Sequence, residues 1–264
     1  MPIVYVPYHL DEYLPDLDVP LPSDAAATEL NAELPEGDVW SRLVSLYGQI
    51  ADVTERTARA GSMPTVVSGD CTVMIGMAAG LRRAGIDPAI VWLDAHGDLQ
   101  TFETTPSGYL GGMALRLLMG YRAESMLDRL GLRPVPADRV MLVDARDLDP
   151  AEAEYIDSSP LRHVPLAELT PATLPAGPLL VNIDLDTVDP AELAGLRYPA
   201  EGGPNVPTIL RAARTILDSG QIAGLNIACT WTAGHGDPDG TRARLVSTIL
   251  ETARQQAGLD ADAA

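Results

Sequence analysis

The chain has 264 residues, of which 46% are hydrophobic and 21% are charged, so its composition is typical of a folded protein and excludes a disordered or fibrous chain. Acidic residues outnumber basic ones by 37 to 18, and the formal net charge of −19 opposes binding to nucleic acids or anionic membranes. The first residues lack the pattern of a signal peptide, and the most apolar stretch, residues 71–81, is too short to span a bilayer. Two cysteines do not make a disulfide scaffold, and we expect a cytoplasmic protein.

Strand and helix patterns alternate along the chain after an irregular start. A first strand is expected at residues 3–6, and the Pro- and acid-rich stretch 8–38 is typical of a surface loop, with a lid over a site as the alternative. Beyond it, short apolar runs predict strands, and apolar residues three or four apart predict helices. The expected strands are 65–68, 89–93, 140–143, 179–185 and 222–228, and the expected helices run through 43–53, 72–84, 112–119, 206–217 and 241–256.

This alternation, with no linker or internal repeat, predicts one domain covering residues 1–264. Strands that are apolar throughout are typical of a parallel sheet covered by helices on both faces. We therefore expect an α/β protein with three layers, α/β/α, and a mostly parallel central sheet. Ligands of such sheets bind beyond the carboxyl ends of the strands, where functional residues should be sought.

Acidic side chains follow two of these strands. Asp94, His96 and Asp98 come directly after one apolar run, and Asp184 and Asp186 come after another. Residues two apart in extended chain point the same way, so each set converges. Carboxylates aimed at one place repel unless cations hold them, and oxygen ligands with one imidazole suit Mn²⁺ or Mg²⁺. The alternative is structural, because Asp after a strand often caps a helix or forms a turn.

Several motifs resemble those of one enzyme family. DAHGD at 94–98 and NIDLDTVDP at 182–190 closely resemble the two most specific signatures of the ureohydrolases, which comprise arginases, agmatinases and their relatives. SGD at 68–70, SGYLGG at 107–112 and ARDLDP at 145–150 are similar to further family motifs and occur in the expected order. The resemblance implies an arginase-like fold and a hydrolase that attacks the guanidinium carbon of a small-molecule guanidino substrate.

The resemblance also implies a binuclear manganese centre. Asp94 and Asp184 would bridge two Mn²⁺ ions. Asp98 would complete one ion, and His96 and Asp186 would complete the other. In the family the two metals share a water, lower its pKa and direct the hydroxide at the guanidinium carbon. Asp98 would also accept a hydrogen bond from this hydroxide, which makes it the expected catalytic residue.

Three positions depart from the family pattern. The usual first ligand is a His directly after Gly-Asp, where this chain has Cys71; its thiolate would bind a metal, and the alternative is a buried apolar cysteine. Gly111 stands where the arginases have a proton-carrying His. Cys229 stands where the last strand normally delivers a Glu that pairs with the guanidinium, so a charge-assisted pair is lost. A Cys71–Cys229 disulfide in metal-free protein is a further alternative.

Other side chains are candidates to hold the substrate. Tyr109 replaces the Asn that contacts the substrate carboxylate in the family, while Gln100 and Ser107 can still donate hydrogen bonds. Asp149 matches the family carboxylate near the α-amino group of the substrate. Glu152 would be its neighbour, or else a cap of the helix that follows. With Cys229, these residues form the expected substrate-binding set.

The departures make a poor site for arginine and favour a guanidine that is less basic and carries an ionisable hydroxyl. N-hydroxy-L-arginine has both properties, and the combination resembles the N-hydroxy-L-arginine amidinohydrolases of D-cycloserine biosynthesis within the family. We therefore expect cleavage to hydroxyurea and L-ornithine. The alternatives are another guanidino compound, such as arginine, agmatine or guanidinobutyrate, and a metal-binding pseudoenzyme.

Two further expectations concern the remaining histidines and the oligomeric state. His235, after the last strand, is a reserve candidate for the missing proton donor, whereas His9 and His163 are expected to be ordinary surface or turn residues. The strong like charge opposes self-association, so we expect a monomer.

Overall fold

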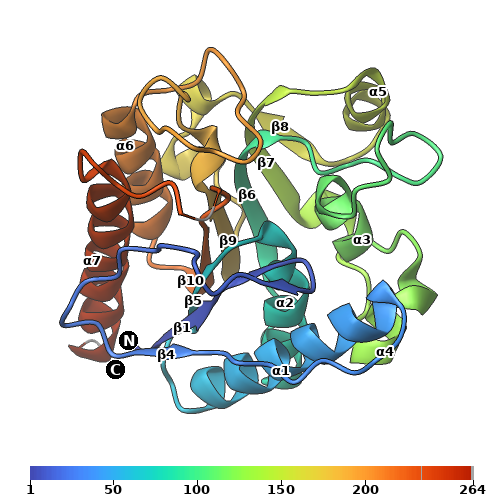
Figure 1. Ribbon diagram of the computed structural model, residues 1–264, viewed down its shortest axis with the longest axis horizontal. Helices are drawn as coiled ribbons and strands as arrows, with labels where there is room; N and C mark the ends of the chain where they lie inside the picture. The colour runs from blue at the N-terminus through green and yellow to red at the C-terminus, as the bar shows by residue number, and fades with distance from the viewer. Residues whose placement is uncertain (233, 263–264) are drawn as a thin grey trace.

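The computed structural model describes residues 1–232 and 234–262 and is built around one eight-stranded sheet (Figure 1). All the strand pairings of this sheet are parallel, which confirms the predicted fold class. In spatial order the strands are β4 (Ala27–Glu29), β1 (Ile3–Val6), β5 (Thr65–Ser68), β10 (Ile222–Ala228), β9 (Leu179–Asp184), β6 (Ala89–His96), β7 (Val140–Asp147) and β8 (Arg162–Val164).

The central strands are buried on both faces because nearly all their side chains are apolar. All residues of β5 (TVVS) and β9 (LLVNID) are buried, and β6 is buried up to its last residue, His96. Apolar runs of this kind exclude water from both sides of the sheet, so helices must cover both faces.

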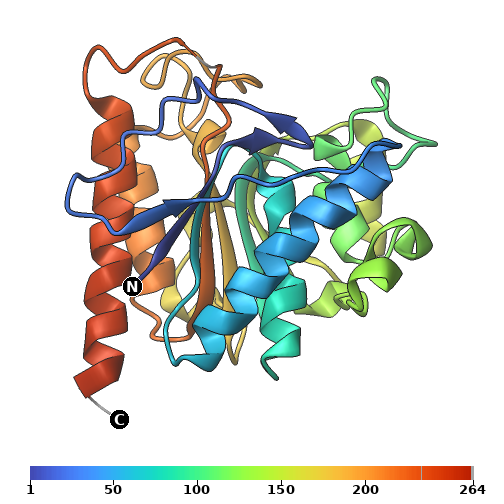
Figure 2. The same cartoon turned by 60° about the horizontal axis from the view of Figure 1, so that its bottom comes forward.

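Helices form the two outer layers, as Figures 1 and 2 show. Side chains of α6 (Val206–Leu217) and α7 (Thr241–Asp262) belong to the hydrophobic core on one face. Those of α1 (Val39–Arg59) and α2 (Met74–Arg83) belong to the core on the other. The shorter helices that pack against this second core are α3 (Ala114–Leu118), α4 (Leu127–Leu130) and α5 (Pro150–Ser158). The structure thus has the expected three layers, and no helix in its described part is long and apolar enough to cross a membrane.

The N-terminal stretch is more ordered than predicted. Residues 8–38, expected to be an irregular loop, contain an antiparallel hairpin of β2 (Tyr8–His9) and β3 (Glu12–Tyr13), and β4, which pairs with β1. The side chain of His9, expected at the surface, is only 6% exposed. The prediction of an irregular loop was wrong because strands of two or three residues are too short for a hydrophobic period to be recognised in the sequence.

Other elements have the predicted type with shifted ends. β6 and β7 run three and four residues further than expected, and α2 is preceded by a turn of 3₁₀ helix at Cys71–Val73. The short α4, α5 and β8 were not predicted. The carboxyl ends of β5, β6 and β9 meet at one edge of the sheet, which is the edge that carries the acidic motifs.

Candidate active site

A cavity of about 580 Å³ lies at this carboxyl edge of the sheet. Its walls come from the ends of β5, β6 and β9 and from the loops around residues 100–112 and 147–152. All the predicted metal ligands line it: Cys71, Asp94, His96, Asp98, Asp184 and Asp186.

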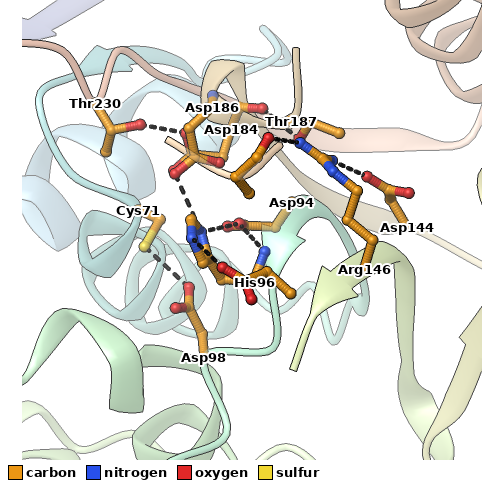
Figure 3. Close-up of polar contacts among 12 residues, drawn as sticks. Cys71, Asp94, His96, Asp98, Asp144, Arg146, Asp184, Asp186, Thr187 and Thr230 are labelled. Carbon is orange, nitrogen blue, oxygen red and sulfur yellow. Dashed lines mark hydrogen bonds and ion pairs between the residues drawn. The ribbon is translucent and has the colours of Figure 1, made fainter. Parts of the chain in front are cut away.

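Within the cavity, the side chains form two groups whose ligand atoms lie within 4.8 Å of one another (Figure 3). Cys71, Asp94 and Asp98 make one group. Asp94, His96 and Asp186 make the other, so Asp94 belongs to both. Asp184 lines the same cavity, and its Oδ1 accepts hydrogen bonds from the hydroxyl of Thr230 and from the backbone N–H of Asp186 (3.1 Å).

Local hydrogen bonds orient the shared carboxylate. Oδ1 of Asp94 accepts from the backbone N–H of His96 (2.8 Å), and Oδ2 accepts from the indole N–H of Trp92 (3.2 Å). Nδ1 of His96 lies 3.3 Å from Asp94 and 3.2 Å from Oδ2 of Asp186. Asp98 has a left-handed backbone with φ +53°, and its carbonyl accepts from the Leu115 N–H (3.0 Å).

Burial and mutual repulsion raise the pKa of several cavity carboxyl groups. The pKa values of Asp98 and Asp184 lie well above the ordinary value, because of burial first and neighbouring carboxylates second. Burial and then Asp94 raise the pKa of Asp186 to about 6. Oδ1 of Asp186 is buried and has no hydrogen-bond partner in the described part of the chain. Bound cations would relieve the repulsion between the carboxylates, and one of them would be bound by Oδ1 of Asp186, so the residues fit a metal centre.

The surrounding carboxylates favour the charged form of the His96 imidazole and the neutral form of the Cys71 thiol. Burial disfavours a charged His96, but its hydrogen bonds to Asp186 and Asp94 outweigh burial and raise its pKa to about 12. Burial, followed by repulsion from Asp98, raises the pKa of the Cys71 thiol well above its ordinary value. Sγ of Cys71 lies 3.3 Å from Oδ2 of Asp98, to which a thiol can donate. Metal ions must displace these protons in order to bind.

The predicted substrate contacts form the outer part of the cavity, with one exception. Gln100, Ser107, Tyr109 and Asp149 all line it. Nε2 of Gln100 donates to Oδ2 of Asp149 (2.6 Å), and the hydroxyl of Ser107 accepts from the N–H of Tyr109 (3.2 Å). Glu152 is held by the backbone N–H groups of residues 99 and 149 (2.9 and 3.0 Å), so it braces this wall as the capping alternative expected.

Cys229 is the exception, because it lies outside the described lining of the cavity. β10 ends one residue earlier, and Cys229 turns into the apolar core on the α6–α7 face of the sheet, where it is fully buried. The next residue, Thr230, lines the cavity instead. Both cysteines are free thiols, so the alternative of a Cys71–Cys229 disulfide does not occur here. His235 packs beside Gly195, away from the lining.

Sequence reasoning missed one cluster at the cavity wall. Nδ1 of His9 lies 3.1 Å from Oδ2 of Asp70, and Nε2 lies 3.0 Å from Oη of Tyr109 and 3.3 Å from Oη of Tyr198. Asp70, Tyr109 and Tyr198 line the cavity. The SGD motif offered a signal for Asp70, but nothing near His9 in the sequence indicates its partners.

The protein has a parallel α/β/α fold with a cavity at the carboxyl edge of its sheet. Acidic residues, a histidine and a cysteine line this cavity and form a candidate metal centre. The family whose model matches the chain is the arginase family, over residues 10–253. The chain therefore belongs to the arginase family, as its motifs predicted.

Individual relatives agree with this family. The arginase of Bacillus subtilis is 29% identical over 187 residues, which are 66% of this chain and 63% of that protein. The N(omega)-hydroxy-L-arginine amidinohydrolase of Streptomyces lavendulae is 28% identical over 183 residues, which are 68% of this chain and 64% of that protein. Both matches span slightly less than two thirds of the relative's length. The crystal structure of Bacillus subtilis arginase has the same fold, with a TM-score of 0.79 and 24% identity over 96% of this chain and 97% of that chain.

Proposed function

We propose that this protein is a binuclear manganese amidinohydrolase that cleaves N-hydroxy-L-arginine to hydroxyurea and L-ornithine. The observation that carries the proposal is the position of Asp94 in both groups of potential ligands, because one carboxylate shared by two groups is what a pair of adjacent ions requires. Membership in the arginase family supports hydrolysis of a guanidino group.

The two groups would hold one ion each. Cys71 and Asp98 would bind the first, His96 and Asp186 the second, and Asp94 both; Asp184 would join them from the same cavity. Two bound divalent ions would lower the pKa of a shared water and so supply a nucleophile at neutral pH. Carboxylate oxygens with one imidazole suit Mn²⁺, to which Cys71 adds a softer ligand.

The outer cavity suits the amino-acid end of the substrate. Asp149 offers a carboxylate for the α-ammonium group, and Gln100 holds this carboxylate in place. The hydroxyl of Ser107 and the amide of Gln100 are donors for the substrate carboxylate. The guanidine then extends towards the two groups of ligands.

The inner cavity favours a guanidine that is neutral. The end of β10 brings Cys229 into the core and Thr230 into the lining, and neither is a carboxylate that could pair with a guanidinium. Leaving a buried charge without its partner costs about 3–5 kcal/mol, or roughly two to four orders of magnitude in affinity or rate. N-hydroxylation makes the guanidine much less basic, so this penalty is avoided. The Streptomyces lavendulae relative, whose name specifies N-hydroxy-L-arginine, supports the same substrate.

The test compares the two substrates in one assay. Manganese-loaded protein is given L-arginine or N-hydroxy-L-arginine, and L-ornithine, the amine product of both, is measured. We expect kcat/KM to be higher for N-hydroxy-L-arginine by at least about a hundredfold. Comparable values would refute the substrate, and no ornithine from either would refute the activity. The Asp94→Asn variant, which lacks the shared ligand, is the control for activity that does not depend on the metal centre.

A further inference from the structure

Arg146 belongs to the ARDLDP motif but is not among the described residues that line the cavity. Its neighbours Asp147 and Asp149 do line it. The side chain of Arg146 forms an ion pair with Asp144 (Figure 3), and the two side chains are only 17% and 13% exposed. A guanidinium has five N–H donors, so one carboxylate leaves several of them to bind another part of the chain.

The backbone before Arg146 has an unusual conformation. Asp144 and Ala145 have φ values of +71° and +46°, in the left-handed region that residues other than glycine rarely adopt. The pairing of β7 with β6 shifts by one residue at this point, so that Asp147, and not Arg146, faces His96. Bulges of this kind change the direction of a side chain at the end of a strand. This bulge brings Asp147 to the cavity and leaves Arg146 to contact a different segment.

The guanidinium of Arg146 binds a loop that is distant in the sequence. Nη2 donates to the carbonyl of Ala200 (2.8 Å), and Nε donates to the carbonyl of Glu201 (3.3 Å). The loop lies close to the guanidinium, because a Cβ atom on Gly203 would be 2.6 Å from Nη2 of Arg146. A planar fork that binds one carboxylate and two carbonyls fixes both the distance and the orientation of the loop, which an ammonium group would not do.

The loop that Arg146 holds, residues 188–205, contains no helix or strand in the described part of the chain. Within residues 198–203, the described hydrogen bonds have two partners outside the loop, which are Arg146 and His9. Tyr198 belongs to this part of the loop and lines the cavity. A loop of this length keeps one conformation only where contacts hold it, so Arg146 fixes the position of Tyr198 in the cavity wall.

We propose that Arg146 is a positioning residue that fixes the cavity wall carrying Tyr198 relative to the wall carrying Asp149. The inference rests on the proposed function, in which Asp149 binds the α-ammonium group of the substrate. Asp149 is the N-cap of α5 and follows Arg146 closely in the chain, while Tyr198 is close to the two carbonyls that Arg146 binds. Without Arg146, the amino-acid end of the substrate would meet a mobile wall, and its binding would weaken while the metal centre stayed intact.

The first test measures substrate positioning in the full-length, manganese-loaded protein. Arg146→Gln should raise KM for N-hydroxy-L-arginine at least about tenfold, with kcat changed by less than about threefold, because a displaced wall weakens binding rather than the chemical step. The dissociation constant of L-ornithine, the product with the same amino-acid end, should rise by a similar factor in calorimetry. The manganese content should stay the same.

Three further variants identify the contact that is responsible. Arg146→Lys keeps the positive charge without the planar fork and should resemble Arg146→Gln. Gly203→Ala places a Cβ against the guanidinium and disturbs the same contact from the loop, so adding it to Arg146→Gln should raise KM little further. Arg139→Gln removes an arginine that pairs with Asp87 beside the other end of β7; it is the matched control and should keep the wild-type KM.

Hydrogen exchange measures the loop without a substrate. In Arg146→Gln, peptides that cover residues 188–205 should exchange at least about tenfold faster than in the wild-type protein, whereas peptides from β6 and β9 should not change. Equal exchange rates in the loop would show that Arg146 does not hold it, and would refute the proposal.

The outcomes separate this proposal from the proposed function. A wild-type protein that neither binds L-ornithine nor hydrolyses a guanidino substrate refutes the proposed function, and with it the role of Arg146 in positioning the substrate. If the wild-type protein is active and Arg146→Gln keeps KM within about twofold, only the role of Arg146 is refuted. A loss of manganese, or a fall in kcat with an unchanged KM, would show that Arg146 supports the fold in general, and would refute this role as well.

Discussion

Chelating the metal ions should leave a protein whose stability falls as the pH rises from about 4 to about 6.5. Asp186 is the group from which the size of this effect can be worked out. Its pKa is raised from 3.8 to about 6 in the folded protein, so the folded state holds this proton more tightly than the unfolded state does. The resulting stabilisation is fully present below pH 3.8 and is lost as the pH rises through 6.

The shift of about two pKa units corresponds to about 3 kcal/mol of unfolding free energy. When a metal ion is bound, Asp186 is an ionised ligand and this pH dependence disappears. The difference in stability between metal-loaded and metal-free protein should therefore grow by about 3 kcal/mol over this window, which is about 6–12 °C in melting temperature for a chain of this size. The raised pKa values of Asp98 and Asp184 act in the same direction.

Thermal unfolding by circular dichroism, with manganese and with chelator at several pH values, measures this difference. Groups outside the cavity contribute equally to the stability of the metal-loaded and metal-free forms, so their contributions cancel in the difference. In Asp186→Asn, which has no proton to lose at this position, the difference should grow by about 3 kcal/mol less over the same window, and the growth that remains comes from Asp98 and Asp184. A difference in the wild-type protein that stays constant or narrows as the pH rises would refute the reasoning.

Two further predictions concern the positions that depart from the family pattern. Cys71→Ala should reduce bound manganese from about two ions per chain to about one, and Cys71→His should keep both ions. Cys229→Ala, which removes a buried thiol outside the cavity lining, is the control and should not change the metal content. Equal metal content in all three variants would show that Cys71 is a packing residue only. Gly111→His should lower the unfolding free energy by about 1–3 kcal/mol, because the Cβ of the new side chain overlaps the Tyr109 ring. In thermal unfolding, the double variant Tyr109→Asn/Gly111→His should recover most of this lost stability. A Gly111→His variant as stable as the wild-type protein would contradict the overlap.

The sequence predicted the parts of this protein that depend on local patterns. Apolar runs located the strands that are buried on both faces, and the Asp-x-His and Asp-x-Asp spacings put the ligands at strand ends, because adjacent parallel strands end at one edge. Prediction from the sequence failed for side chains whose positions depend on long-range packing. The cluster of His9, Asp70 and Tyr109 joins three segments far apart in the chain. The direction of Cys229 depends on how the chain leaves β10, and one residue of difference moves a side chain from the cavity to the core.

The three departures are compatible with a functioning centre because the fold, rather than the metal, orients much of the ligand set. Both oxygens of Asp94 are held by Trp92 and His96, and Asp184 is held by Thr230. Trp92 and His96 lie on β6, and Thr230 is the second residue after β10, so the conformational cost of ordering the carboxylates is met when the protein folds. Gly111 and Cys229 take no part in these hydrogen bonds, so under the proposed function the residues at these two positions can affect the substrate without disturbing the ligands. We therefore expect substitutions at these two positions to change the preferred guanidine and leave the metal content unchanged, because different residues would select the guanidine and orient the ligands.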